Sequence, residues 1–238
     1  MKSMRYQAIL FDLDGTLLPM DQDHFVQYYF REMGKVLCPL GIEPQALTDA
    51  IWAGTKAMVV NDGARRNAEV FWDTFARRSG KDPAVFRPAA DGFYSAQFNL
   101  ARPATGENPL AVKAVQLAHE KADRVVLATN PLFPMTGQIT RMRWIGLSPA
   151  DFDLVTCYES DGYCKPNPAY YADICRRLSL EPARCLMIGN DEGEDMIPAG
   201  SLGMETCLVT DCRITSRGEP WQGRSLTFAG MCDWLAGL

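Results

Sequence analysis

Residues 9–17 (ILFDLDGTL) constrain the fold most, because an apolar run ends there in two carboxylates, Asp12 and Asp14. Side chains two residues apart on an extended segment point the same way, so both carboxylates are predicted to face one small volume beyond a buried strand. Two like charges that close repel unless a cation or a shared proton compensates them. The pattern indicates a divalent cation, or one ionised and one protonated carboxyl, although an ordinary Asp-Gly turn gives the same residues.

The remaining apolar segments predict an α/β protein. Short apolar runs lie at residues 6–11, 124–129, 152–157, 185–189 and 205–209, and the later ones alternate with helical segments. Strands that alternate with helices typically form a parallel sheet covered by helices. We therefore expect a three-layer, Rossmann-like parallel sheet as the core.

A helical insertion is predicted between the first and second strands. Residues 20–102 contain no convincing strand, and Phe25 and Tyr29 begin a series of apolar residues at helical spacing. Ligands of open α/β sheets bind at the carboxyl edge, so an insertion from that edge is expected to cover the site as a lid. We expect a core of residues 1–19 and 103–238 and an all-helical cap of residues 20–102.

Composition argues against several classes of protein. The chain has 238 residues and a formal net charge of −5, so it lacks the basic excess of proteins that bind nucleic-acid phosphates. No apolar stretch is long enough to span a bilayer or to serve as a secretory signal, which predicts a cytoplasmic protein without a membrane partner. Eight cysteines without a C-x-x-C pair, and only two histidines, favour reduced packing cysteines over a zinc site. A monomer and a homodimer remain equally open.

Polar residues also follow the later predicted strands. Thr129 and Asn130 follow the second strand, Lys165 follows the third, and Asp191 and Asp195 follow the fourth. Singly, these residues are typical of helix caps, solvated surface lysines and acids at helix N-termini. Four such groups at the same edge of one sheet favour a reaction site, and Asp191 is the better metal ligand because it lies closest to its strand.

At these residues the chain resembles the phosphatases of the haloacid dehalogenase superfamily. DLDGT at residues 12–16 resembles the first of the family's four motifs, Thr129 the second, Lys165 the third, and Asp191 with Asp195 the fourth. The insertion resembles the helical cap called C1. The resemblance implies a Mg²⁺-dependent phosphohydrolase that acts on a small phosphate monoester.

The resemblance implies a role for each matched residue. Asp12 would attack phosphorus to form an aspartyl-phosphate, and Asp14 would protonate the leaving alcohol and then activate water. Thr129 and Asn130 would contact the phosphoryl oxygens, and Lys165 would offset their charge.

The Mg²⁺ ligands implied by the resemblance are Asp12, the backbone carbonyl of Asp14, and Asp191. Asp195 would be a ligand through water or would orient the others. The family often has an acid directly after the glycine, where this chain has Asn190, so Asn190, Asp191 and Asp195 all remain candidates for the fourth-motif ligand.

Several alternatives remain. Asp14 argues against a dehalogenase, because displacing halide needs no acid for an alkoxide. A phosphomutase and a non-catalytic phosphate-binding protein stay open, and the substrate is not identified. Polar residues near a predicted turn, Asn61, Arg65, Arg66 and Asn67, would contact the substrate or simply be solvated, and Arg65 is the one we assign to substrate binding.

Overall fold

The centre of the fold is a six-stranded parallel sheet with the order β3-β2-β1-β4-β5-β6. The structure is a computed structural model and describes residues 4–216 and 221–238. The strands are β1 (Tyr6–Phe11), β2 (Ala122–Leu127), β3 (Leu154–Val155), β4 (Cys185–Gly189), β5 (Glu205–Val209) and β6 (Arg224–Leu226).

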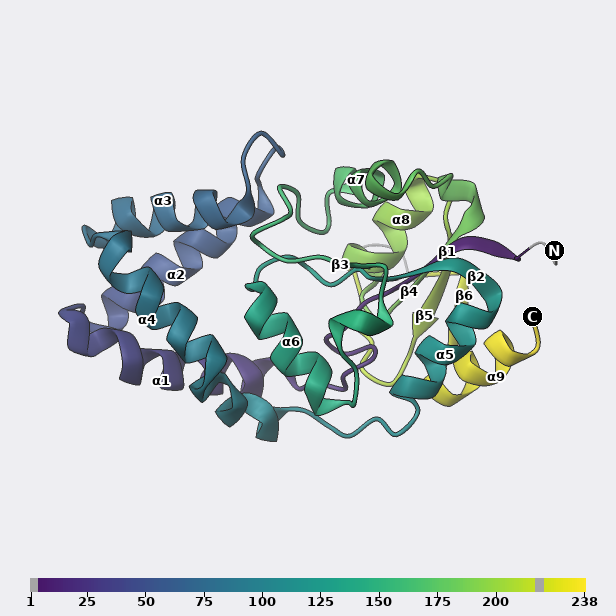
Figure 1. Ribbon diagram of the computed structural model, residues 1–238, viewed down its shortest axis with the longest axis horizontal. Helices are drawn as coiled ribbons and strands as arrows, with labels where there is room; N and C mark the ends of the chain where they lie inside the picture. Colours follow the sequence, from purple (N-terminus) through teal and green to yellow (C-terminus); the bar gives the residue numbers. More distant parts are fainter. Residues whose placement is uncertain (1–3, 217–220) are drawn as a thin grey trace.

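Helices cover both faces of the sheet, so the core has three layers (Figure 1). Ile9 and Phe11 of β1 pack toward α5 (Ala111–Lys121) and α9 (Phe228–Ala236). Ala8 and Leu10 point to the opposite face and pack toward α7 (Pro168–Leu178) and α8 (Ile197–Ser201). Both faces of β1 are buried, as expected for a parallel strand with helices on each side. The predicted α/β fold is confirmed.

Strand order places the predicted site at the centre of the sheet edge. β1 pairs with β2 on one side and with β4 on the other, and Phe11 lies opposite Leu127 and Ile188. The residues that follow these three strands therefore meet at the carboxyl edge. The connection from β1 leads to β2 on one side of the sheet, and that from β4 leads to β5 on the other side.

The strands differ in detail from the sequence-based prediction. β2 begins and ends two residues earlier than residues 124–129, and β3 contains only two of residues 152–157. β6 was not predicted, because its three residues include Arg224 and Ser225 and form no apolar run. β3 and β6 are the two edge strands, where apolar patterning is weakest because one side lacks a partner strand.

The long connection from β1 to α5 is helical (Figure 1). Its helices are buried against one another through an aromatic core that includes Phe25, Phe75 and Phe93. The division into a core of residues 1–19 and 103–238 and a cap of residues 20–102 stays a prediction, and residues 1–3 and 217–220 of that core lie outside the described part. This connection contains α1 (Gln22–Leu37), α2 (Pro44–Val59), α3 (Asn67–Ser79), α4 (Pro83–Ser95) and the 3₁₀ segments Cys38–Leu40 and Gln97–Ala104.

The remaining elements in the described part of the chain are one helix that packs against α4 and three short helical turns. They are α6 (Met135–Trp144), the 3₁₀ turns Pro149–Asp151 and Pro182–Arg184, and a π-helical turn at Glu192–Met196. In residues 4–216 and 221–238, no helix combines the length and the apolar composition needed to cross a membrane.

Phe98 joins the helical connection to the segment that follows β2. Its ring centroid lies 5.9 Å from that of Phe133 and 5.8 Å from that of Trp144 in α6. It also lies 5.9 Å from Phe25 of α1, and its side chain is fully buried. Such aromatic contacts fix the helical connection over the sheet edge.

Phe98→Ala is expected to lower the free energy of unfolding by about 3–5 kcal/mol, since it removes a buried aromatic ring and leaves a cavity. Urea unfolding followed by circular dichroism measures the change. Leu100→Ala is the matched control, because Leu100 lies in the same segment and is 51% exposed; it should change stability by less than about 0.5 kcal/mol. Equal effects of the two variants would contradict this role of Phe98.

Candidate active site

A buried lysine connects two of the predicted carboxylates. Lys165 Nζ donates to Asp12 Oδ1 at 2.8 Å and to Asp195 Oδ1 at 2.6 Å, and the lysine is 1% exposed. Burial alone would lower the pKa of Lys165, but the two carboxylates outweigh it and hold the pKa well above its usual value. The structure thus brings together residues that follow β1, β3 and β4, with a permanent positive charge between them.

Asp12 is fixed on its other side by Thr16. The Thr16 hydroxyl lies 3.1 Å from Asp12 Oδ2 and 3.0 Å from Asn190 Oδ1. The Asp12 backbone N–H also donates to the carbonyl of Ile188 at 2.9 Å, which extends the pairing of β1 with β4. The Asp12 carboxylate is therefore held from two directions.

Asp14 has a partner that the sequence did not indicate. A guanidinium N–H of Arg141 in α6 donates to Asp14 Oδ2. Arg141 is fully buried, bonds to Gln138 and lies 4.4 Å from the centroid of the Phe133 ring. No residue type or spacing distinguishes Arg141 from Arg143 on the same helix, because both are simply arginines near a helix C-terminus.

The surroundings of Asp14 favour its protonated form. Burial raises the pKa of the Asp14 carboxyl above its usual value, and the Arg141 guanidinium opposes part of that rise. Asp14 Oδ1 is buried and has no hydrogen-bond partner in the described residues. Such an atom is suited to hold a proton or to contact a bound ligand.

The fourth motif forms a turn in which Asp195 folds back onto its own backbone. Asp195 Oδ2 accepts from the N–H groups of Asn190 at 3.1 Å and Asp191 at 3.0 Å. A side chain at Gly189 would overlap this carboxylate, which accounts for the glycine there. Because Lys165 occupies the other oxygen, Asp195 is placed to orient Asp191.

Asp191 and Asn190 are held differently. Asp191 caps the turn at Glu192–Met196, and its bonds to the N–H groups of Gly193 and Glu194 both use Oδ1. The Asn190 side chain instead bonds to the carbonyl of Cys212 at 2.7 Å and faces Thr16. Of these two residues, Asp191 has an oxygen that these bonds do not use.

The two residues after β2 also differ. Thr129 is 1% exposed and lines the same cavity as Asp12, and its carbonyl accepts from Thr156 and Tyr170. The Asn130 amide N–H donates to Glu194 at 3.0 Å. A phosphate bound to that amide would compete with Glu194, a contact that the sequence did not indicate.

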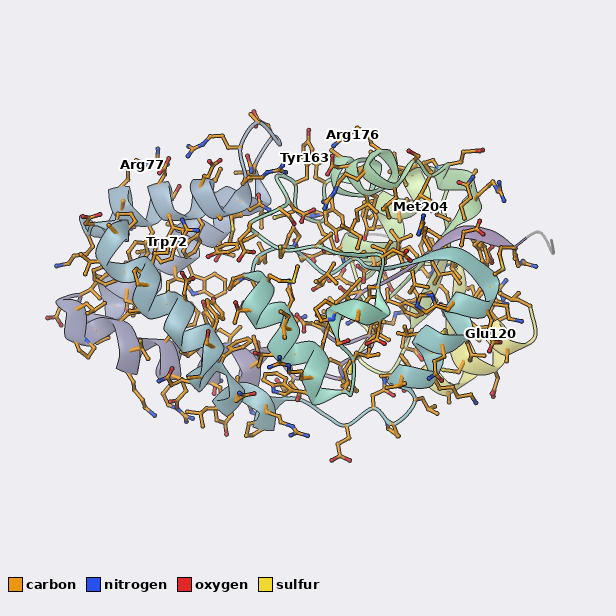
Figure 2. The ribbon with its side chains drawn as sticks, in the orientation of Figure 1. Trp72, Arg77, Glu120, Tyr163, Arg176 and Met204 are labelled. Atoms are coloured by element: carbon orange, nitrogen blue, oxygen red, sulfur yellow. The ribbon has the colours of Figure 1, made fainter. Side chains whose placement is uncertain are left out.

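Arg65 lies apart from these groups. Its guanidinium pairs with Asp73 at 2.7 Å, and it does not line the cavity that contains Asp12. The adjacent Asn67 is fully buried and bonds to the carbonyls of Pro131 and Tyr163. Figure 2 shows Tyr163 beside this turn between α2 and α3. The turn contacts the loops around the site through Asn67, whereas Arg65 pairs with Asp73.

A cavity of about 260 Å³ joins the carboxylates to the helical connection. Asp12, Asp14 and Asp191 line one end of it, and apolar side chains of α1 to α4 line the other. Mg²⁺ prefers one or two carboxylates, water and substrate phosphate as ligands, and the Asp12 carboxylate together with the open oxygen of Asp191 fits that preference. Within residues 4–216 and 221–238, no three His, Cys, Asp or Glu side chains converge on one point as a complete protein cage would require.

A sequence profile of the haloacid dehalogenase-like hydrolases matches residues 6–203. The chain belongs to this family. The glyceraldehyde 3-phosphate phosphatase of Methanopyrus kandleri is 23% identical over 205 residues, which cover 85% of this chain and 83% of that protein. Family membership identifies the chain as a hydrolase.

Solved structures support the fold of this hydrolase. The 2-haloacid dehalogenase of Pseudomonas syringae pv. tomato DC3000 aligns with a TM-score of 0.62 at 17% identity and covers 98% of each chain. The HAD-hydrolase YfnB of Bacillus subtilis, bound to magnesium, aligns with a TM-score of 0.59 at 17% identity, covering 98% of this chain and 100% of that one. At these identities the likeness concerns the fold alone.

Arg141→Gln is expected to move the alkaline limb of the pH profile of kcat/KM to higher pH. A general acid is active while protonated, and loss of the guanidinium raises the pKa of Asp14 further, so the proton is retained to higher pH. Arg143→Gln is the matched control, because Arg143 is exposed on the same helix. An alkaline limb that stays in place in Arg141→Gln would contradict this coupling.

Proposed function

We propose that this hydrolase is a Mg²⁺-dependent phosphatase that cleaves small phosphate monoesters through an aspartyl-phosphate. The observation that carries the proposal is the pair of unlike carboxylates at one end of the cavity. Asp12 lies against the Lys165 ammonium at 2.8 Å, and Asp14 lies in surroundings that raise its pKa. A nucleophile and an acid need opposite protonation states, and these two environments favour them.

In the first step an Asp12 oxygen attacks phosphorus, and the bond from phosphorus to the leaving oxygen breaks. Asp14 transfers its proton to that oxygen, so an alcohol leaves and an aspartyl-phosphate remains. Water then attacks phosphorus, Asp14 takes the proton, and phosphate leaves as Asp12 is restored. Lys165 and Thr129 stabilise the negative charge of the phosphoryl group throughout. Dehalogenation would need no proton from Asp14.

Asp12, the Asp14 backbone carbonyl and Asp191 are the proposed Mg²⁺ ligands, and Asp195 orients Asp191 through the backbone N–H that it accepts. When bound, Mg²⁺ would offset the charge of the phosphoryl oxygens during transfer. The magnesium in the related Bacillus subtilis structure supports this choice of metal.

The phosphatase name of the Methanopyrus kandleri relative supports a small phosphorylated molecule as the substrate. The helices of residues 20–102 are proposed to act as a cap that excludes water while phosphoryl transfer occurs. A cytoplasmic location and a monomeric or homodimeric state stay predictions.

Asp12→Asn is expected to reduce phosphate release from para-nitrophenyl phosphate to the uncatalysed level, because the amide is a poor nucleophile. Acid quenching of the unaltered protein with radiolabelled substrate should trap label on Asp12, and the variant should trap none. Asp123→Asn, an exposed aspartate at the start of β2, should keep full activity. Undiminished turnover in Asp12→Asn would show that Asp12 is not the nucleophile.

Removal of divalent cations by EDTA is expected to abolish turnover, and added Mg²⁺ should restore it. Without the metal, Lys165 would face the combined charge of the phosphoryl group and several carboxylates. Phosphate release with EDTA, and then with Mg²⁺ in excess, measures this. Turnover that persists in EDTA would show that Lys165 alone compensates the charge.

A further inference from the structure

The cavity above the carboxylates is long and follows one face of α1. Phe25, Tyr29, Met33 and Leu37 recur every four residues, and all four line it. Twelve residues of an α-helix rise about 18 Å, so the lining extends roughly that far along the helix. Asp12 and Asp14 line the same cavity, so the cavity is continuous with the candidate active site at the sheet edge.

Charge is confined to one end of this cavity. The charged residues of its lining are Asp12, Asp14, Asp191, Glu194 and Asp195, all at the sheet edge. Among the described residues that line it there is no lysine, arginine or histidine. A carboxylate or second phosphate on the leaving group would enter without a counter-charge, which is strongly unfavourable in an apolar pocket.

Of the three tyrosines that line the cavity, Tyr29 and Tyr94 offer little to a polar ligand. The hydroxyls of Tyr29 and Tyr94 lie 2.8 Å apart and bond to each other. Burial raises the pKa of Tyr29 to about 12 and that of Tyr94 well above its usual value, so both stay neutral. Their rings therefore act as apolar surface, as does the ring of Phe75, which also lines the cavity.

Aromatic rings continue this apolar surface on the opposite side. Phe71 and Trp72 of α3 line the cavity, with ring centroids 5.2 Å apart, and Figure 2 shows Trp72 among the side chains within the helical region. At about 260 Å³ the cavity exceeds the roughly 150 Å³ of an engineered apolar cavity that binds benzene. There is space for a hydrocarbon group larger than one phenyl ring.

We propose that this cavity binds the leaving group of the substrate, and that this group is an uncharged, elongated hydrocarbon chain. The inference rests on the proposed phosphatase function, since the carboxylates fix the end at which the phosphate lies. The preferred substrate would therefore be a long alkyl phosphate, and a short monoester with a second anionic group would be a poor one.

The first test compares kcat/KM for ethyl, butyl, hexyl and octyl phosphate with that for phosphoglycolate. Each buried methylene is expected to raise kcat/KM about threefold to fourfold, because burial of the chain stabilises the transition state relative to the free substrate. Phosphoglycolate should be the poorest substrate of the series. Equal values across the alkyl series, or a preference for phosphoglycolate, would overturn the inference and leave the phosphatase function intact.

The second test separates binding from turnover. Alkyl phosphonates have no ester bond to cleave, and isothermal titration of the intact protein with Mg²⁺ gives their dissociation constants. Octyl phosphonate is expected to bind at least tenfold more tightly than butyl phosphonate. If no monoester is hydrolysed but this preference remains, the phosphatase proposal fails and the assignment of the cavity holds. Equal affinities would overturn the assignment even for an active enzyme.

A variant pair tests the location. Ala90 of α4 lines the cavity and is 4% exposed, so Ala90→Leu should fill it and lower the octyl-to-ethyl ratio of kcat/KM at least tenfold. Ala84→Leu, an exposed position on the same helix, should leave the ratio unchanged. An unchanged octyl-to-ethyl ratio in folded Ala90→Leu would show that the alkyl group of the substrate binds outside this cavity. If this variant does not fold, the phosphonate series on the unaltered protein still decides.

Discussion

The active site depends on one buried ammonium group, that of Lys165, held between Asp12 and Asp195 at 2.8 and 2.6 Å. Ions in a protein interior are costly unless they are paired and hydrogen-bonded, and removing one partner leaves an uncompensated charge. Here the three groups follow β1, β3 and β4, so pairing them requires these strands to assemble with β2 between β3 and β1. The same interaction positions the proposed nucleophile and, through Asp195, the backbone of Asp191.

The second carboxylate of the first motif has a different partner. Asp14 bonds to Arg141, whose guanidinium is itself buried against Phe133 and Gln138. Burial raises the pKa of the Asp14 carboxyl, while Arg141 limits the rise. Two aspartates separated by one residue thus lie in different electrostatic surroundings, as acid and nucleophile roles require. The aromatic ring that covers Arg141 also contacts Phe98, which links this ion pair to the helical connection.

The cavity divides into two chemical regions that come from different parts of the chain. Carboxylates that follow β1 and β4 line the end at the sheet edge. Apolar side chains of α1, four residues apart, line the rest of the cavity. A polar end and an apolar end in one cavity orient an amphipathic ligand in a single direction. The helices proposed to exclude water from phosphoryl transfer are thus the same ones proposed to bind the rest of the substrate.

The sequence by itself determined the α/β class, the helical character of the connection between the first two strands and the identity of the polar residues at the strand ends. These follow from strand and helix periodicities and from motif spacing, which are local properties. Only the tertiary structure decided which of those residues meet. It placed Arg141, 127 residues away, against Asp14, while Arg143 on the same helix stays exposed. It also turned Arg65 toward Asp73 and Asp195 toward its own backbone. Residue type and spacing do not specify such contacts, since they arise from the packing of distant segments around a shared buried charge.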